Sequence, residues 1–171
     1  MKLKFKIPSM TESFQLDMTD LQLLGLLQQD SSQSNQALAA RVHISPPTCL
    51  RRVKRLRDAG LIEREIAILN PDKLAAVTGH GLTAIIEITL DRQGAEHVEA
   101  FELRVAADHA VQQCYRVSPG PDFILVVHVA DMPRYLALAQ RLFTNDANVR
   151  NVKAFFSTRR AKFELGVLLQ R

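Results

Sequence analysis

Residues 45 to 57 constrain the fold of this chain more than any other stretch, because a helix start signal is followed there by an amphipathic pattern. Ser45 can accept a hydrogen bond from the free amides of a first helical turn, and the proline that follows it suits that turn. At 3.6 residues per turn, one side of this helix carries Cys49, Val53 and Leu56, and the other side is basic. A helix needs its apolar side in order to pack, but it does not need an unbroken basic side. The pattern predicts a docked helix whose cationic face suits a polyanion such as DNA.

The basic stretch has a simpler alternative interpretation. Residues 41 to 57 contain six lysine or arginine residues and no acidic residue. Charged helix faces are often only solvated surface, and arginine is a good helix former. The basic face alone does not decide between these readings, so its neighbours in the sequence matter.

Two further helices are predicted upstream of this segment. The first begins at Thr19 as N-cap and has an apolar stripe of Leu21, Leu24 and Leu27, with Leu23 as a further candidate. The second covers residues 36 to 42, with Ala37, Leu38 and Val42 facing inward, and a connection of residues 43 to 45 leads to the basic helix. Two short helices joined by so tight a turn are typical of the helix-turn-helix motif, whose second helix enters the major groove.

The end of the basic helix also carries a signal. Gly60 can adopt the left-handed conformation that closes a helix. Residues 61 to 69 then alternate apolar and polar side chains, as a short strand or wing does. We assign this wing no contact with DNA, because Glu63 and Glu65 repel phosphate.

Several longer motifs occur together in residues 16 to 74. They are Leu16-Asp17-x-x-Asp20, Asn35-x-x-Leu38-Ala39-x-x-Val42, Ser45-Pro46, Thr48-Cys49-Leu50-x-Arg52-Val53-x-Arg55-Leu56, Ala59-Gly60-Leu61-Ile62 and Leu69-Asn70-Pro71-x-x-Leu74. This combination resembles the DNA-binding half of the Lrp/AsnC family of bacterial and archaeal transcription regulators. The resemblance continues more weakly to about residue 160. It implies a sequence-specific DNA-binding transcriptional regulator that binds double-stranded DNA.

The candidate DNA contacts divide by chemistry. Arg51, Arg52 and Arg55 are predicted to contact phosphates or guanine, and Thr48 and Pro47 are placed for base edges or a thymine methyl group. Ser45 is predicted to cap the helix, whose free amides face a phosphate. Two residues that open the second helix are candidates for the DNA backbone, although simple capping is the alternative for them: Asn35 and Gln36.

The second half of the chain alternates strand and helix patterns. Strands are predicted at residues 82–90, 111–117, 123–130 and 151–158, and helices at 94–107 and from the cap Asp131 to residue 143. In the strand 82–90, residues 82, 84, 86, 88 and 90 share one face. The residues expected to face inward from the two helices are Val98, Phe101, Val105, Tyr135, Leu136, Ala139 and Leu142. Together with the helices upstream, this βαββαβ order predicts an α+β chain: an N-terminal (winged) helix-turn-helix domain followed by a ferredoxin-like domain. The family resemblance implies that this second domain is the effector or RAM domain.

One face of such a sheet lacks a helical layer. The strand 123–130 is apolar on both faces, and a monomer rarely exposes a large contiguous apolar patch. A second subunit in a two-fold homodimer is predicted to cover it, and the alternative is burial by the C-terminal tail, residues 163–169. The family resemblance implies the same dimer, with further assembly into tetramers, octamers or hexadecamers.

The family resemblance also implies a small effector, usually an amino acid, bound near a Gly-Asp-Tyr/Phe-Asp loop. Here the corresponding stretch is Ser118-Pro119-Gly120-Pro121-Asp122-Phe123, so only part of the signature is present. The two prolines remove amide donors that a ligand carboxylate would use, which places the usual amino-acid effector in question. Three alternatives stay open: an altered pocket, a pocket for another ligand and an inactive one. Gly120, Asp122 and Thr158 are the ligand candidates.

A chain of 171 residues suffices for two small domains. We divide it into an N-terminal extension (1–15), a helix-turn-helix domain (16–69), a linker (70–81), an effector and dimerisation domain (82–160) and a tail (161–171). The extension is expected to be an edge strand or a disordered basic arm. Two lone cysteines, Cys49 and Cys114, favour a reducing compartment, the cytoplasm, and the chain has no apolar run of membrane-spanning length.

No enzyme is predicted, and no cofactor or metal. None of the five histidines pairs with another histidine or a cysteine at metal-ligand spacing. Siroheme decarboxylases resemble this two-domain layout, and His109, Arg116 and His128 are the residues that such an enzyme could use. A second alternative is an architectural DNA-compacting protein with little sequence preference, which is distinguished by its ratio of specific to non-specific affinity.

Overall fold

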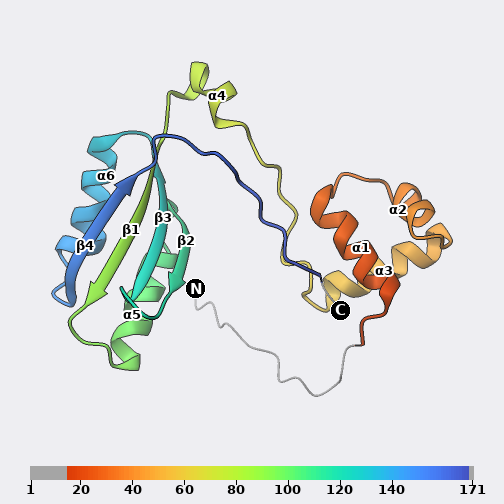
Figure 1. Ribbon diagram of the computed structural model, residues 1–171, viewed down its shortest axis with the longest axis horizontal. Coiled ribbons are helices and arrows are strands. Elements are labelled where there is room, and N and C mark those ends of the chain that lie inside the picture. The colour runs from red at the N-terminus through yellow and green to blue at the C-terminus, as the bar shows by residue number, and fades with distance from the viewer. Residues whose placement is uncertain (1–14, 170–171) are drawn as a thin grey trace. The chain divides into compact units, whose positions relative to one another are not determined.

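The computed structural model describes residues 15 to 169, so the expected basic arm lies almost entirely outside the described residues (Figure 1). The described chain forms two compact units. The first combines residues up to 67 with the tail from Glu164, and the second comprises residues 68 to 163.

The first unit contains helices α1 (Met18–Gln29), α2 (Asn35–Arg41) and α3 (Pro46–Asp58). The N-cap of α1 is Asp17 and not the expected Thr19, because the carboxylate of Asp17 accepts the amide N–H of Asp20 while the Asp20 carboxylate accepts that of Asp17. This reciprocal pair is a capping box. Ser34 caps α2, and Ser45 caps α3 as predicted.

A small apolar core joins these three helices. Its members are Leu23, Leu27, Leu38, Ala39, Val42, Cys49, Val53 and Leu56. The predicted inward residues of α3 are confirmed. Leu23, only a secondary candidate, is the most buried leucine of α1, and in α2 the buried alanine is Ala39, whereas Ala37 is exposed. The α2 prediction was wrong for Ala37. The buried face of α2 runs through Leu38, Ala39 and Val42, and Ala37 lies one step around the helix from Leu38 on the side away from Ala39.

The connections that follow the three helices differ from expectation at residues 61–69 and 70–81. Gly60 has a φ of 71°, the predicted left-handed conformation, and His43 in the turn before α3 has a φ of 54°. The strand expected at residues 61–69 does not form, since no described segment pairs with it. The predicted linker 70–81 contains a helix, α4 (Pro71–Thr78), which Asn70 caps through its side chain.

The second unit is a four-stranded antiparallel sheet with two helices on one face (Figure 1). Its elements are β1 (Leu82–Leu90), α5 (Ala95–Ala106), β2 (Val111–Arg116), β3 (Phe123–Val129), α6 (Met132–Ala139) with a π-helical turn η1 (Gln140–Thr144), and β4 (Val149–Phe156). The strand order β2-β3-β1-β4 with this βαββαβ sequence confirms the ferredoxin-like prediction.

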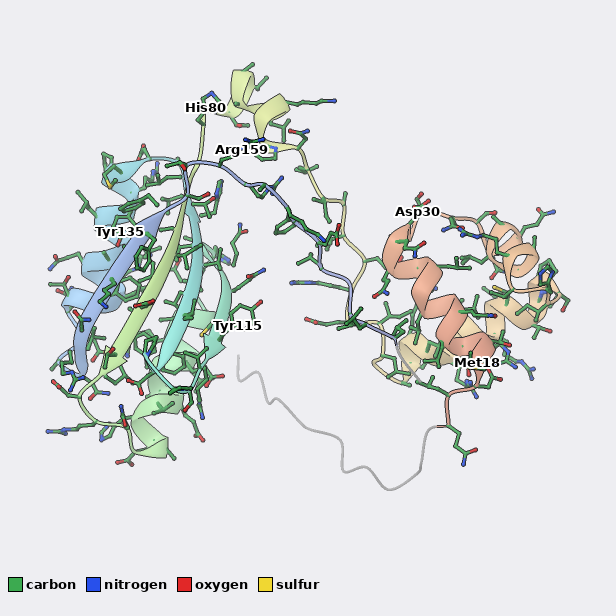
Figure 2. All side chains as sticks on the ribbon, viewed as in Figure 1. Met18, Asp30, His80, Tyr115, Tyr135 and Arg159 are labelled. Atoms are coloured by element: carbon green, nitrogen blue, oxygen red, sulfur yellow. The ribbon has the colours of Figure 1, made fainter. Side chains whose placement is uncertain are left out.

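The core of this unit lies between the sheet and its helices. All five alternate residues predicted for one face of β1 face the helices, and Val98, Phe101 and Val105 of α5 are buried. Tyr135 of α6 is also buried and makes an edge-on contact with Phe156 of β4, whereas Tyr115 lies on the edge strand β2 (Figure 2). The prediction for Leu136 was wrong: it is 60% exposed and Leu138 is buried in its place. Tyr135, Leu138 and Leu142 lie three or four residues apart, and Leu136 is turned away from that row.

The other face of the sheet has no helical layer. On this face Ile85 of β1 lies opposite Val126 of β3 and Phe155 of β4. Ile85 is 44% exposed and Phe155 is 53% exposed, so this face is open in the single chain. The alternative, in which the C-terminal tail buries this face, is wrong. The tail from Glu164 belongs to the first unit, where the side-chain amide of Gln28 in α1 donates to the carbonyl of Val167 and accepts the N–H of Val167.

Candidate functional site

The outward face of α3 is the candidate surface for nucleic acid. Leu50, Arg51 and Lys54 are exposed there, and Leu50 is 58% exposed despite its apolar side chain. Arg51 and Lys54 have no ion-pair partner within residues 15 to 169. Sequence reasoning did not select Leu50 or Lys54 as contacts. The helical phase alone could have found them, because they follow Pro47 by three and seven residues.

Two of the predicted DNA contacts are instead paired with carboxylates of α1. The guanidinium of Arg52 donates from Nη1 to Asp17 Oδ2 at 2.6 Å and to Asp20 Oδ1 at 2.8 Å. Arg55 donates from Nη2 to Asp20 Oδ2. Hydrogen bonds to Asp17 and then Asp20 raise the pKa of Arg52, and the Asp20 amide, followed by Arg52, lowers the pKa of Asp17. The structure therefore gives Arg52 and Arg55 partners within their own unit, and their contact with DNA stays a prediction.

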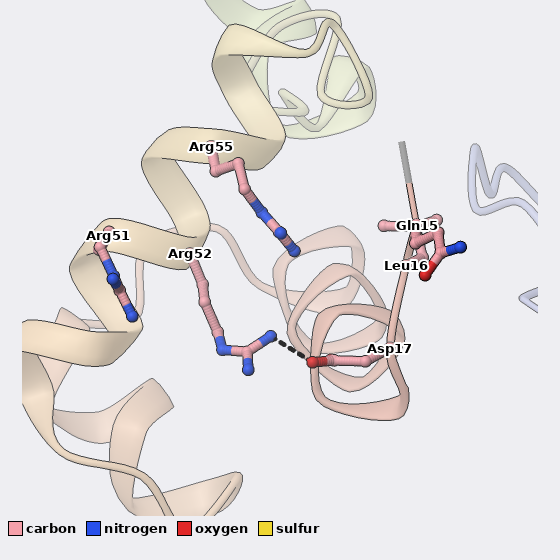
Figure 3. Close-up of a pocket in the computed structure, with 6 residues that line it drawn as sticks. All are labelled: Gln15, Leu16, Asp17, Arg51, Arg52 and Arg55. Atoms are coloured by element: carbon pink, nitrogen blue, oxygen red, sulfur yellow. Dashed lines mark hydrogen bonds and ion pairs between the residues drawn. The ribbon is translucent and has the colours of Figure 1, made fainter. Parts of the chain in front are cut away.

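A hollow of about 610 Å³ lies beside these pairs. It is lined by Gln15, Leu16, Asp17, Arg51, Arg52 and Arg55. Figure 3 shows Arg52 and Arg55 extending from α3 toward the start of α1, with the ion pair between Arg52 and Asp17 dashed. Sequence reasoning did not foresee the role of Asp20, because no local pattern indicates a contact across more than thirty residues.

The first turn of α3 has no free amides to offer a phosphate. The first two helical residues are prolines, which carry no N–H. The Thr48 amide donates to Ser45 Oγ, and the Cys49 amide donates to the Ser45 carbonyl. The expectation of free amides was therefore wrong. The hydroxyl groups of Thr48 and Ser45 are also hydrogen bonded to each other, at 2.8 Å, which fixes the Thr48 side chain.

The two residues that open α2 have different surroundings. The side-chain amide of Asn35 donates to the carbonyl of Pro46 at 2.7 Å, which ties α2 to the start of α3. Gln36 is exposed. Asn35 therefore has a structural hydrogen bond, and Gln36 is the more accessible of the pair.

The second candidate site is the loop between β2 and β3. Gly120 has a φ of 125°, and the Ser118–Pro119 peptide bond is cis. Asp122 accepts the amide N–H of Leu90 through Oδ2 at 2.7 Å, so this carboxylate anchors the loop to β1. A hollow of about 390 Å³ adjoins the loop and is lined by Gln93, Ala95, Val98, Arg116, Val117 and Asp122.

The structure does not bring the three predicted effector residues together within one chain. Asp122 bonds to Leu90 at the end of β1, whereas Thr158 follows β4, whose last residue pairs with Ala84 near the start of β1. The remaining candidate residues are also dispersed. Arg116 pairs with Glu102 and lies opposite Phe123, whereas His128 bonds to Thr83 at the other end of the strand pair. Arg116 and His128 therefore do not line one pocket, as the enzyme alternative with His109, Arg116 and His128 would require.

Other chemistry is limited within the described residues. No group of histidine, cysteine and acidic side chains there could hold a metal ion, and no helix there is both long and apolar enough to cross a membrane. Burial raises the pKa of the Cys114 thiol to about 11, with Glu102 adding to the shift. That thiol stays protonated near neutral pH.

Comparison with known proteins gives a consistent result in both halves of the chain. Residues 16–63 match the winged helix-turn-helix DNA-binding family, and residues 83–167 match the Lrp/AsnC ligand binding domain. The chain is 32% identical over 154 residues to an HTH-type transcriptional regulator of Haemophilus influenzae, covering 90% of this chain and 89% of that one. It is 40% identical over 123 residues to the leucine-responsive regulatory protein of the same species, covering 72% of each.

A solved structure extends the likeness to three dimensions. A transcriptional regulator from Neisseria meningitidis, crystallised with L-methionine, matches with a TM-score of 0.77 and 27% identity over 91% of this chain and 97% of that one.

Proposed function

The chain belongs to the Lrp/AsnC family of DNA-binding transcriptional regulators, and on that premise we propose that it reads DNA through the outward face of α3. The observation that carries the proposal is the exposed group Leu50, Arg51 and Lys54 on a helix whose start is capped by Ser45. The two cations have no carboxylate partner within the described residues, so they are available to phosphates or to guanine. Leu50 suits the methyl group of thymine.

The residues around this group have supporting roles. Pro47 is exposed beside Leu50, and Gln36 is exposed at the start of α2, so both belong to the proposed surface. Ser45 and Asn35 hold the helix ends in place through their hydrogen bonds. Thr48 presents its methyl group while its hydroxyl remains bonded to Ser45.

The role of Arg51 is tested by its removal. We expect Arg51→Ala to weaken binding to a selected site by about 1–3 kcal/mol if Arg51 reads a base, or to reduce the salt slope by about one if it contacts a phosphate. Titrations of a genomic fragment, first located by footprinting with the purified protein, measure both quantities at several salt concentrations. Arg134→Ala is the matched control, because Arg134 is an exposed arginine of the second unit. Unchanged binding in the Arg51 variant would remove Arg51 from the proposed surface.

The same titrations distinguish a regulator from a DNA-compacting protein. A regulator binds its selected fragment far more tightly than random-sequence DNA at one fixed salt concentration, whereas a compacting protein binds both alike. We favour the regulator because Leu50 and Thr48 add base-reading groups to the charge of α3.

We further propose that the second unit forms a homodimer through the open face of its sheet and that its loop 117–122 lines an effector pocket. The Neisseria relative was solved with L-methionine. Here Pro119 and Pro121 carry no N–H, and Asp122 Oδ2 already accepts the Leu90 amide. These features remove groups that would hold an amino-acid ligand, and a site that also used Thr158 would need residues from two chains.

A direct binding measurement tests the effector proposal. We expect isothermal titration calorimetry of the full chain with leucine and methionine to give no micromolar isotherm, because the loop lacks amide donors for the ligand carboxylate. A clear micromolar isotherm with either amino acid would refute this reading of the loop. The Pro121→Tyr variant, which restores the aromatic residue of the family loop, is the matched comparison.

A further inference from the structure

The buried carboxylate of Asp20 is unusual for this molecule. Asp20 is the one polar or charged side chain of the described residues that is fully buried, with 0% exposure. It accepts three donors: the amide of Asp17 and the guanidinium groups of Arg52 and Arg55. A desolvated carboxylate is costly unless it is paired in this way, so its partners cannot leave it without a large penalty.

The first turn of α1 holds this carboxylate in place. Asp17 and Asp20 exchange hydrogen bonds through their side chains and amides, at 3.2 and 2.9 Å, so neither carboxylate can rotate freely. Both carboxylates then meet at Arg52, whose Nη1 lies within 2.8 Å of each. The side chain of Arg52 is only 26% exposed and its Nε is buried without a hydrogen-bond partner. Arg52 is therefore directed inward to α1 and not outward to a ligand.

Stability alone does not account for this arrangement. Leucine, valine and cysteine side chains already pack α1 against α3, and a buried ion pair often stabilises a protein no more than apolar residues of similar size. The effect that is specific to the carboxylates is electrostatic. They neutralise two arginines on the helix that faces DNA and hold them away from its outward side.

We propose that Asp20, assisted by Asp17, is a specificity-determining residue that withholds Arg52 and Arg55 from the phosphates of DNA of arbitrary sequence. This inference rests on the proposed DNA-binding function of α3. Phosphate contacts supply most non-specific affinity and carry no sequence information. With two cations withheld, recognition depends more on the exposed group Leu50, Arg51 and Lys54.

The test is the salt dependence of binding to a random-sequence DNA duplex. Asp20→Asn keeps the size of the side chain and removes its charge, so Arg55 loses this carboxylate and Arg52 keeps only the half-exposed Asp17, which lets their side chains turn toward phosphates. We expect the slope of log affinity against log salt to steepen by about one per arginine that reaches a phosphate, and binding near 0.1 M salt to tighten about tenfold per contact. The matched control is Asp58→Asn, since Asp58 is exposed on the same helix and makes no ion pair within the described residues. It changes the net charge equally and should leave the slope unchanged.

A second pair of variants keeps the inference testable if Asp20→Asn fails to fold. Arg55→Gln in the wild-type background should leave the slope unchanged, and a shallower slope would overturn the proposal. Asp17→Asn alters a half-exposed carboxylate, with 52% of the side chain exposed, so this variant should fold. Arg52 keeps the buried carboxylate of Asp20 in this variant, so the slope should stay unchanged, and a steeper slope would show that Asp17 and not Asp20 withholds Arg52.

These outcomes differ from failure of the proposed function. A wild-type protein that binds neither random-sequence DNA nor any genomic fragment refutes DNA binding itself. If the wild-type protein binds DNA and a folded Asp20→Asn variant shows the same salt slope, only the proposed role of Asp20 is overturned.

Discussion

Arg51 and Arg52 are neighbours in the sequence, yet their side chains have different surroundings. Arg52 meets Asp17 and Asp20, whereas Arg51 is exposed and has no ion-pair partner within the described residues. The difference follows from the 100° rotation between successive helical residues. A substitution of Arg51 therefore tests DNA contact, whereas a substitution of Arg52 also tests the packing of α1 against α3. Loss of DNA binding in an Arg52 variant would have to be separated from the destabilisation that an incompletely paired, buried Asp20 causes.

Leu50 offers a test of base reading at the scale of one methyl group. If its exposed side chain contacts a thymine methyl, replacing that thymine by uracil should cost about 1 kcal/mol in the wild-type protein. The same replacement should cost almost nothing in Leu50→Ala, because the contact is already lost. Affinities of both proteins for both duplexes form a double-mutant cycle. Equal losses in the two proteins would show that Leu50 does not contact the substituted methyl group.

At the scale of single elements, residues near in sequence could be predicted better than residues far apart. The cap Ser45, the buried side of α3 and all four strands of the second unit follow from local signals and periodicity. The first helix was given the wrong N-cap because Thr19 and Asp17 both suit that position, and only the reciprocal bond with Asp20 decides between them.

The candidate site was less predictable than the fold. The basic face of α3 could be read from the sequence, but the pairing of Arg52 and Arg55 could not, since it depends on how α1 crosses α3. The helical phase also misplaced Leu136, because a short helix allows several choices of buried face until its packing against the sheet is known.

The contact between α1 and α3 should depend on pH. The Asp20 amide, and then Arg52, lowers the pKa of Asp17 in the folded protein. The contribution of Asp17 to stability is therefore fully present above its ordinary pKa of about 3.9, and it is lost as the pH falls through the lower folded value.

Urea unfolding monitored between pH 6 and pH 2 measures this dependence. We expect Asp17→Asn to be less stable than wild type near neutral pH and to lose less stability on acidification, so the two curves should converge at low pH. Asp58→Asn serves as the control, because Asp58 makes no ion pair within the described residues. Parallel curves for wild type and Asp17→Asn would contradict this role for Asp17.

At the scale of the whole molecule, one chain presents one recognition helix and one open sheet face. A single helix reads only a few base pairs, and a two-fold dimer presents two helices to two half-sites. The open face carries Ile85, Val126 and Phe155 in register across three strands, which is the apolar surface that a second copy can cover. The C-terminal tail does not supply this cover, because Val167 of the tail is hydrogen bonded to Gln28 of α1 in the first unit.

This arrangement predicts that a charged side chain on the open face will prevent dimerisation and leave the fold of the single chain intact. Phe155 is 53% exposed in the single chain, so Phe155→Glu should leave the monomer folded while placing a carboxylate against a partner's apolar surface. We expect a monomer by light scattering at micromolar concentrations, with circular dichroism unchanged and affinity for a two-half-site fragment reduced about a hundredfold or more. Leu136→Glu is the matched control, since Leu136 is 60% exposed on α6, on the helical side of the sheet. A Phe155→Glu protein that remains a dimer would place the subunit interface elsewhere, and a monomer with undiminished affinity would mean that one recognition helix suffices.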